Sequence, residues 1–135
     1  MNVFLDTGVL VSAFGTRGLS ADVLRHVLVE HELVLADVVL RDLERALRRQ
    51  LHLPRGFFAP VMVLLRPFAV KAAPSVRARS SRAQKLLAVA VSSGADVLVT
   101  GDRRLLRCAP PRGLWILTPR GFWEHLRRHR SGALA

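Results

Sequence analysis

The sequence predicts an α/β fold, a three-layer sandwich in which a five-stranded, mostly parallel sheet has helices on both faces. Short runs of aliphatic and β-branched residues alternate along the chain with longer segments of helical periodicity, as in sheets whose parallel strands are joined by crossover helices. The 135 residues, 50% of them hydrophobic, are enough for one domain with a sizeable core. We therefore expect a single domain that spans residues 1–135.

The expected strands are short apolar runs bounded by charged or turn-forming residues. They cover residues 2–6, 32–36, 67–72, 96–100 and 114–117. After the first strand, Ser20 is a suitable N-cap for a helix that ends near His31. Residues 38–50 carry apolar side chains at the spacing of an amphipathic helix.

The second half of the chain carries further helix signals. A proline opens a helix over residues 54–65, which is apolar enough for either the domain core or a dimer interface. The segment QKLLAVAVSS predicts a helix with Gly94 as its C-cap. Thr118 and Pro119 have the residue types of the N-cap and the first position of a closing helix.

The charge balance is strongly basic. Lys and Arg number 21 against 10 Asp and Glu, and the resulting net charge of +11 indicates a polyanionic partner such as nucleic acid. Cys108 is the only cysteine, which excludes an intrachain disulfide and is typical of the reducing cytoplasm. No stretch approaches the roughly 20 uninterrupted apolar residues of a membrane span, so we expect a cytoplasmic protein without membrane association. His125 and His129 lie in a basic helix, where we expect both to be exposed.

Two carboxylates follow predicted strands. Asp6 ends the first strand, and Asp102 follows the fourth. The carboxyl ends of strands form the ligand-binding edge of an open α/β sheet, and two acids that meet there repel each other unless a cation or a proton lies between them. This pattern indicates a metal-dependent enzyme. Two alternatives are that Asp6 caps the helix after the first strand and that Asp102 forms a turn before a short helix.

Two segments carry a family resemblance. FLDTGVLVSAF near the start and LLAVAVSSGADVLVTGDRRLL around residue 100 resemble the two signature segments of PIN domains. These are Mg²⁺- or Mn²⁺-dependent ribonuclease domains found among the toxins of bacterial toxin–antitoxin pairs. The resemblance extends over nearly the whole chain. It implies a PIN-like five-stranded parallel sheet, three or four acids at its carboxyl edge that hold one or two divalent ions, and RNA, an antitoxin protein and a second copy of the chain as partners.

The resemblance assigns the catalytic and metal-binding acids residue by residue. Asp6 corresponds to the first acid of the family, Asp42 to the second and Asp102 to the acid of the T-G-D turn. Glu44 is the alternative to Asp42, because the two lie almost symmetrically on either side of the apolar stripe of their helix. An ion held by these acids would activate a water molecule for hydrolysis of an RNA phosphodiester.

Other positions support this site or depart from the family pattern. Thr7 and Thr100 are the supporting hydroxyl residues, but Gly8 stands where the family usually has Asn. The third acid is replaced by Ala83, and a further acid near the T-G-D turn is replaced by Arg104. Fewer ligands and an added cation both weaken metal binding.

Basic residues near the proposed site could clamp the RNA backbone. The candidates are Arg82, Arg103, Arg104 and Arg107. The missing acid at Ala83 leaves a second function open, in which the chain is a catalytically degenerate PIN-like domain that binds RNA or a protein.

Overall fold

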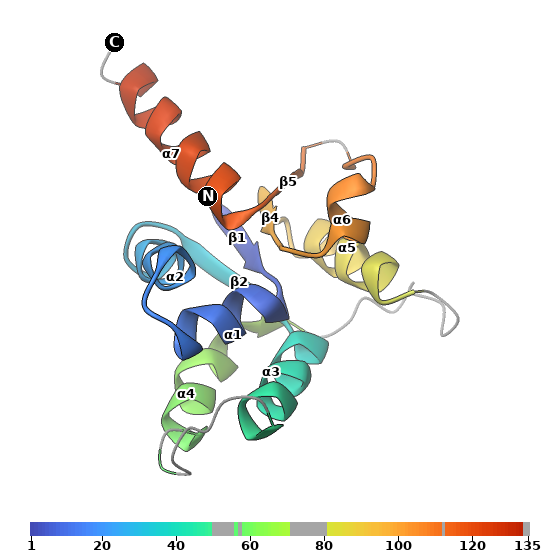
Figure 1. Ribbon diagram of the computed structural model, residues 1–135. Helices are drawn as coiled ribbons and strands as arrows, with labels where there is room; N and C mark the ends of the chain where they lie inside the picture. Colours follow the sequence, from blue (N-terminus) through green and yellow to red (C-terminus); the bar gives the residue numbers. More distant parts are fainter. Residues whose placement is uncertain (50–55, 57, 71–80, 112, 134–135) are drawn as a thin grey trace.

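The sheet is entirely parallel. The computed structural model describes residues 1–49, 56, 58–70, 81–111 and 113–133. Its strands are β1 (Asn2–Leu5), β2 (Glu32–Ala36), β3 (Ala69–Val70), β4 (Val97–Val99) and β5 (Trp115–Leu117). They are hydrogen-bonded in the order β3-β2-β1-β4-β5 (Figure 1). The main part consists of β2, β1, β4 and β5, to which β3 adds two residue pairs beside β2. The predicted α/β class with parallel strands is confirmed.

Helices connect these strands. They are α1 (Thr7–Gly15), α2 (Leu19–Glu30), α3 (Asp37–Arg49), α4 (Phe58–Leu65), α5 (Arg82–Ser92), α6 (Arg103–Arg107) and α7 (Pro119–Ala133), and a 3₁₀ helix, η2 (Arg66–Phe68), precedes β3. Crossovers between parallel strands are right-handed, so the connections from β1 to β2 and from β3 to β4 lie on opposite faces of the sheet. Accordingly, α1 and α2 lie to one side of the strands and α5 and α6 to the other (Figure 1).

The core is centred on β1 and β4. Val3, Phe4 and Leu5 of β1 are completely buried, as are the three residues Val97–Val99 of β4. Both faces of these strands are covered, which explains why they are uninterrupted apolar runs without polar alternation. Within the described residues, no helix is long and apolar enough to cross a bilayer.

Several element boundaries differ from the sequence predictions. Ser20 is not an N-cap, because α2 begins at Leu19 and the Gly18 carbonyl accepts its first hydrogen bond. The third strand begins at Ala69 because residues 66–68, which include Pro67, form a short 3₁₀ helix. Its predicted end lies outside the described residues, as does Pro54, the predicted start of α4.

The closing helix begins as predicted. The amide of Gly121 donates to Thr118 Oγ1 at 3.0 Å, and Pro119 is the first helical residue. The prediction that both histidines of α7 are exposed is wrong for His125, which is buried. Its ring lies 5.2 Å from that of Trp115 and 4.2 Å from that of His129, so aromatic packing covers it.

The apolar helix α4 contributes to the core and to the surface. Val61, Met62 and Leu65 are buried, and Val63 and Leu64 are exposed. One side of α4 is therefore occupied by core packing, as one of the two sequence alternatives expected. A C-terminal glycine also behaves as its residue type predicts: Gly94 has φ +74° just after α5 ends, although the C-cap itself is Ser93.

Candidate functional site

The candidate site lies where the strand order reverses. β1 is flanked by β2 on one side and β4 on the other. The connection that follows β1 and the connection that follows β4 therefore lie on opposite faces of the sheet. Open α/β sheets bind ligands at this switch point, beyond the carboxyl ends of the strands. Asp6 follows β1 at this position and Thr100 follows β4, and both are buried.

The Asp6 carboxylate is fully engaged. Oδ1 accepts a hydrogen bond from the backbone amide of Thr7 at 2.7 Å, which makes Asp6 the N-cap of α1. Oδ2 accepts from Thr100 Oγ1 at 2.8 Å, and Thr100 Oγ1 in turn accepts from the amide of Asp102 at 3.0 Å. Asp6 therefore caps a helix and is also bonded to Thr100 at the end of the neighbouring strand, so capping does not exclude a place at the switch point.

Arg82 brings two carboxylates together. Its Nη2 atom lies 2.9 Å from Asp6 Oδ1 and 2.8 Å from Thr7 Oγ1, and its Nε atom lies 3.1 Å from Asp42 Oδ2. Burial alone would lower the pKa of the Arg82 guanidinium, but the hydrogen bonds and charges of Asp6 and Asp42 outweigh that effect and raise the pKa. A permanent positive charge thus lies between an acid at the end of β1 and an acid of α3.

The geometry distinguishes Asp42 from Glu44. Asp42 contacts Arg82, which also contacts Asp6, whereas Glu44 pairs at 2.9 Å with Arg48, one helical turn further along α3. The side chains of the Glu44 pair are 38% and 67% exposed, as in an ordinary surface ion pair. Of the two acids, Asp42 is therefore the one beside Asp6.

Asp102 has a different role from Asp6 and Asp42. Its Oδ1 atom accepts a hydrogen bond from the amide of Arg104 at 2.9 Å, which caps the short helix α6. Only its backbone amide reaches the Asp6 network, through Thr100. The turn-and-cap alternative describes the conformation of Asp102.

Local capping explains why Arg82 rather than Ala83 faces the acids. Ser81 and Gln84 form a capping box in which Ser81 Oγ accepts from the Gln84 amide at 3.2 Å and Gln84 Oε1 accepts from the Ser81 amide at 3.0 Å. Arg82 is then the first residue of α5, and Ala83 packs against the core. The position predicted to lack an acid therefore has a cation as its neighbour, and that cation contacts Asp6 and Asp42.

The four arginines proposed to clamp RNA differ in their environment. Arg82 is held by Asp6 and Asp42, so the prediction that it clamps RNA conflicts with the bonds it makes. Arg103, Arg104 and Arg107, all of α6, are exposed. The sequence showed Arg82 beside the missing acid, but its contacts with Asp6, Thr7 and Asp42 depend on where the start of α5 lies relative to residues from other parts of the chain.

In this arrangement the residues do not fit a divalent cation. Within the described part of the chain, no three His, Cys, Asp or Glu side chains gather as metal ligands. Both oxygens of Asp6 have partners, and Arg82 occupies the space between Asp6 and Asp42. A divalent ion at this position would face the Arg82 charge at close range, so Arg82 would have to leave first.

Comparison with models of known protein families gives no match for this chain, and no curated protein matches it at a significant level. What the chain does is therefore inferred from the residues at the switch point and from the charge of the surface.

Proposed function

We propose that this protein is a PIN-like domain, with the five-stranded sandwich of that family, that binds single-stranded RNA and has lost metal-dependent cleavage. The observation that carries this proposal is the guanidinium of Arg82, which bridges Asp6 and Asp42 at 2.9 and 3.1 Å. The family would use a metal ion to compensate acids at this edge. Here a residue of the chain itself supplies the positive charge.

Energetics support a persistent bridge. The Asp6 side chain is only 6% exposed, and an unpaired buried carboxylate is strongly destabilising. Arg82 compensates Asp6 and Asp42 together, so its displacement would leave both acids without their counter-ion. A metal ion would have to offset that cost with fewer carboxylate ligands than the family provides. Ala83 stands in place of the third acid, and the carboxylate of Asp102 caps α6.

The surface supports binding of a polyanion. The chain carries a net charge of +11, and α6 alone presents Arg103, Arg104 and Arg107 to solvent. Excess arginine favours phosphate contacts, which need no metal ion. RNA binding and hydrolysis therefore depend on different residues in this chain.

The test combines binding and cleavage in one sample. A fluorescent single-stranded RNA is mixed with the protein in EDTA, Mg²⁺ or Mn²⁺, binding is followed by anisotropy, and RNA integrity is followed on a denaturing gel. We expect equal binding with and without metal, and intact RNA in all three conditions. Metal-dependent cleavage by the wild type that disappears in Asp6→Asn would overturn the proposal, and absence of binding would overturn it separately.

A second candidate is the Mg²⁺- or Mn²⁺-dependent endoribonuclease that the resemblance implies, acting as a toxin countered by an antitoxin protein. The convergence of Asp6 and Asp42 on one cation favours it, because the same two carboxylates could hold an ion if Arg82, whose side chain is 39% exposed, turned outward. Asp6 and Asp42, joined by Asp102, would then be the ligands, and the ion would supply an activated water. The cleavage arm of the same experiment decides between the two functions.

A further inference from the structure

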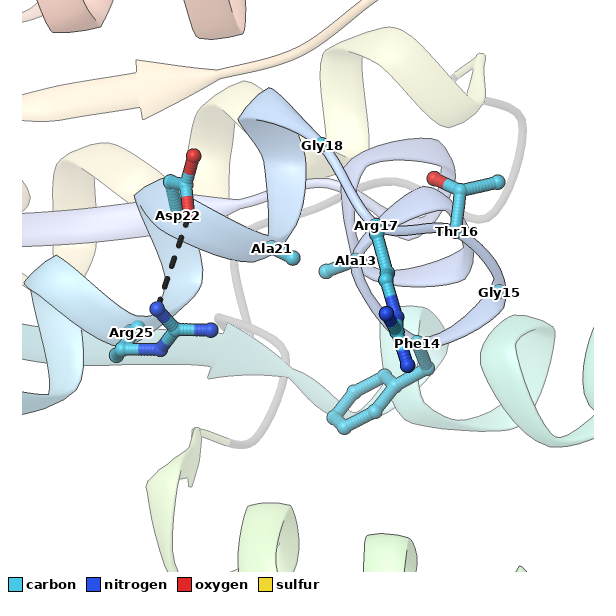
Figure 2. A pocket seen from close by; sticks show the side chains of 9 residues that line it. All are labelled: Ala13, Phe14, Gly15, Thr16, Arg17, Gly18, Ala21, Asp22 and Arg25. Carbon is cyan, nitrogen blue, oxygen red and sulfur yellow. Dashed lines mark ion pairs between the residues drawn. The ribbon is translucent and has the colours of Figure 1, made fainter.

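A groove follows the outer side of α2, at the opposite end of α1 from Asp6. Its first part is a cavity of about 490 Å³ where α1 meets α2, lined among others by Phe14, Arg17, Asp22 and Arg25. In Figure 2, the side chain of Arg17 extends in the direction of the Phe14 ring, and the Asp22–Arg25 pair lies on the α2 side of the cavity. The cavity is open and mixes polar with apolar lining.

The groove continues towards α7. A second cavity, of about 380 Å³, shares Asp22 and Arg25 with the first and adds Val29 and Trp123. A third, of about 250 Å³, shares His26 and Trp123 with the second and adds Leu126 and Arg127. The shared residues make the three cavities one continuous surface, which we call the α2 groove and define by Phe14, Arg17, Arg25, His26, Trp123 and Arg127.

Both aromatic rings and cations line the α2 groove. Single-stranded RNA is bound without sequence preference by cations that contact its phosphates and by aromatic side chains on which its bases stack. The rings of His26 and Trp123 lie 5.8 Å apart at 71°, and both are partly exposed. Because the two rings are nearly perpendicular, a nucleobase would stack on one of them, and the indole of Trp123 is the larger ring.

The ion pair that Asp22 makes with Arg25 in the groove is weak. Asp22 and Glu30 also line it, against Arg17, Arg25 and Arg127. The Asp22–Arg25 pair has a separation of 3.8 Å, and its side chains are 52% and 76% exposed. An exposed pair at this distance contributes little, so Arg25 can turn to a phosphate at small cost.

We propose that the α2 groove is the binding site for single-stranded RNA, with a base stacked on Trp123 and the backbone contacted by Arg17 and Arg25. The proposal rests on the RNA-binding function proposed above and adds the location of the RNA. It separates RNA binding from Asp6 and Arg82, because Asp6 caps the N-terminus of α1 and the groove begins at the other end of that helix.

A matched pair of substitutions tests the location. Val29 on the groove is 74% exposed and Val63 on α4 is 72% exposed, so Val29→Glu and Val63→Glu each add one negative charge to a helix surface without removing core packing. We expect Val29→Glu to weaken the binding of a fluorescent oligoribonucleotide by about tenfold, by repelling phosphate and hindering stacking. Val63→Glu should weaken binding by no more than about threefold, through the change in net charge alone.

A spectroscopic measurement adds an independent test. The chain has two tryptophans, so Trp115→Phe leaves Trp123 as the single tryptophan and keeps a ring beside His125. Saturable quenching of Trp123 by RNA, with the same affinity as the anisotropy signal, is the expected result. Bound RNA that neither quenches Trp123 nor distinguishes Val29→Glu from Val63→Glu overturns the groove and leaves the RNA-binding function standing. A wild type that binds no RNA overturns both.

Discussion

Asp6 is a buried carboxylate, and its cost is compensated by three donors that come from three places in the chain. The Thr7 amide belongs to α1, Thr100 Oγ1 follows β4, and the Arg82 guanidinium begins α5. The first two are neutral and hold the carboxylate in position. Only Arg82 supplies an opposite charge, and it shares that charge with Asp42.

We predict that Arg82→Gln lowers the free energy of unfolding by about 1–3 kcal/mol, because it leaves the charge of Asp6 buried without its counter-ion. The lower part of that range is expected, since the Arg82 side chain is 39% exposed and solvent screens part of the interaction. Urea unfolding followed by circular dichroism measures the change. Arg25→Gln is the control, because it breaks an exposed pair and should cost less than about 0.5 kcal/mol.

A double-mutant cycle separates this interaction from other effects of the substitution. Asp6→Asn removes the buried charge, so in that background Arg82→Gln should cost clearly less than it does in the wild type. If Arg82→Gln costs no more than Arg25→Gln in the wild type, Arg82 is a surface residue and not an internal counter-ion.

At the scale of elements, the sequence predicted well whatever depends on a local signal. β1 and β4 are uninterrupted apolar runs because both of their faces are covered, and α7 starts at the expected Thr118-Pro119 signal. The start of α2 was misplaced because the backbone carbonyl of Gly18 provides the first acceptor and no side chain marks it. Boundaries set by backbone hydrogen bonds leave little trace in residue types.

The candidate site was predictable to the same extent. The strand ends predicted that Asp6 and Asp102 meet, but because β1 and β4 are neighbours it is the Thr100 side chain that bonds Asp6. Asp42 and Glu44 are symmetric on α3, so only the position of the Arg82 side chain, which comes from another crossover, distinguishes them. The Asp102 carboxylate accepts a hydrogen bond from the Arg104 amide at the start of α6, and this local bond sets its orientation.

His31, the C-cap residue of α2, should make stability depend on pH. His31 Nδ1 lies 3.3 Å from the Met1 ammonium, which can only donate, so the neutral imidazole accepts. Burial, then the Met1 charge and His26, lower the pKa of His31 from 6.5. Its Nε2 atom is buried without a partner among the described residues. Protonation would thus place a second positive charge beside Met1.

The sign of the effect follows from proton binding. Below the ordinary pKa of 6.5, unfolded His31 binds a proton that the folded state resists, so stability decreases as pH falls from 6.5 towards the lowered pKa. Burial followed by the charges of His129 and Arg128 lowers the pKa of His125 in the same direction. We predict that urea midpoints measured between about pH 7.5 and 5.5 decrease less in His31→Gln than in the wild type. An equal or steeper decrease in His31→Gln would contradict this assignment.

At the scale of the whole molecule, four of the ten acids form ion pairs with arginines of the described residues. Asp6 and Asp42 share Arg82, Asp22 pairs with Arg25, and Glu44 pairs with Arg48. With 21 basic residues against 10 acidic ones, most of the positive charge is left for solvent and for a partner. Under the proposed function, attraction to RNA is a property of the entire surface, whereas stacking is a property of the α2 groove.

These two contributions predict different responses to salt. Each phosphate neutralised on a single strand contributes about −0.7 to the slope of log K against log salt, so contacts to three to five phosphates give a slope of roughly −2 to −3.5. Stacking on Trp123 releases no counterion and should remain at high salt. We expect Arg25→Ala to make the slope less negative by about 0.7, and Trp123→Phe to lower affinity at every salt concentration with the slope unchanged. Anisotropy titrations from low to high salt measure both. A slope near zero would contradict electrostatic binding, and equal slope changes in the two variants would mean that Trp123 and Arg25 do not act as a stacking ring and a phosphate contact.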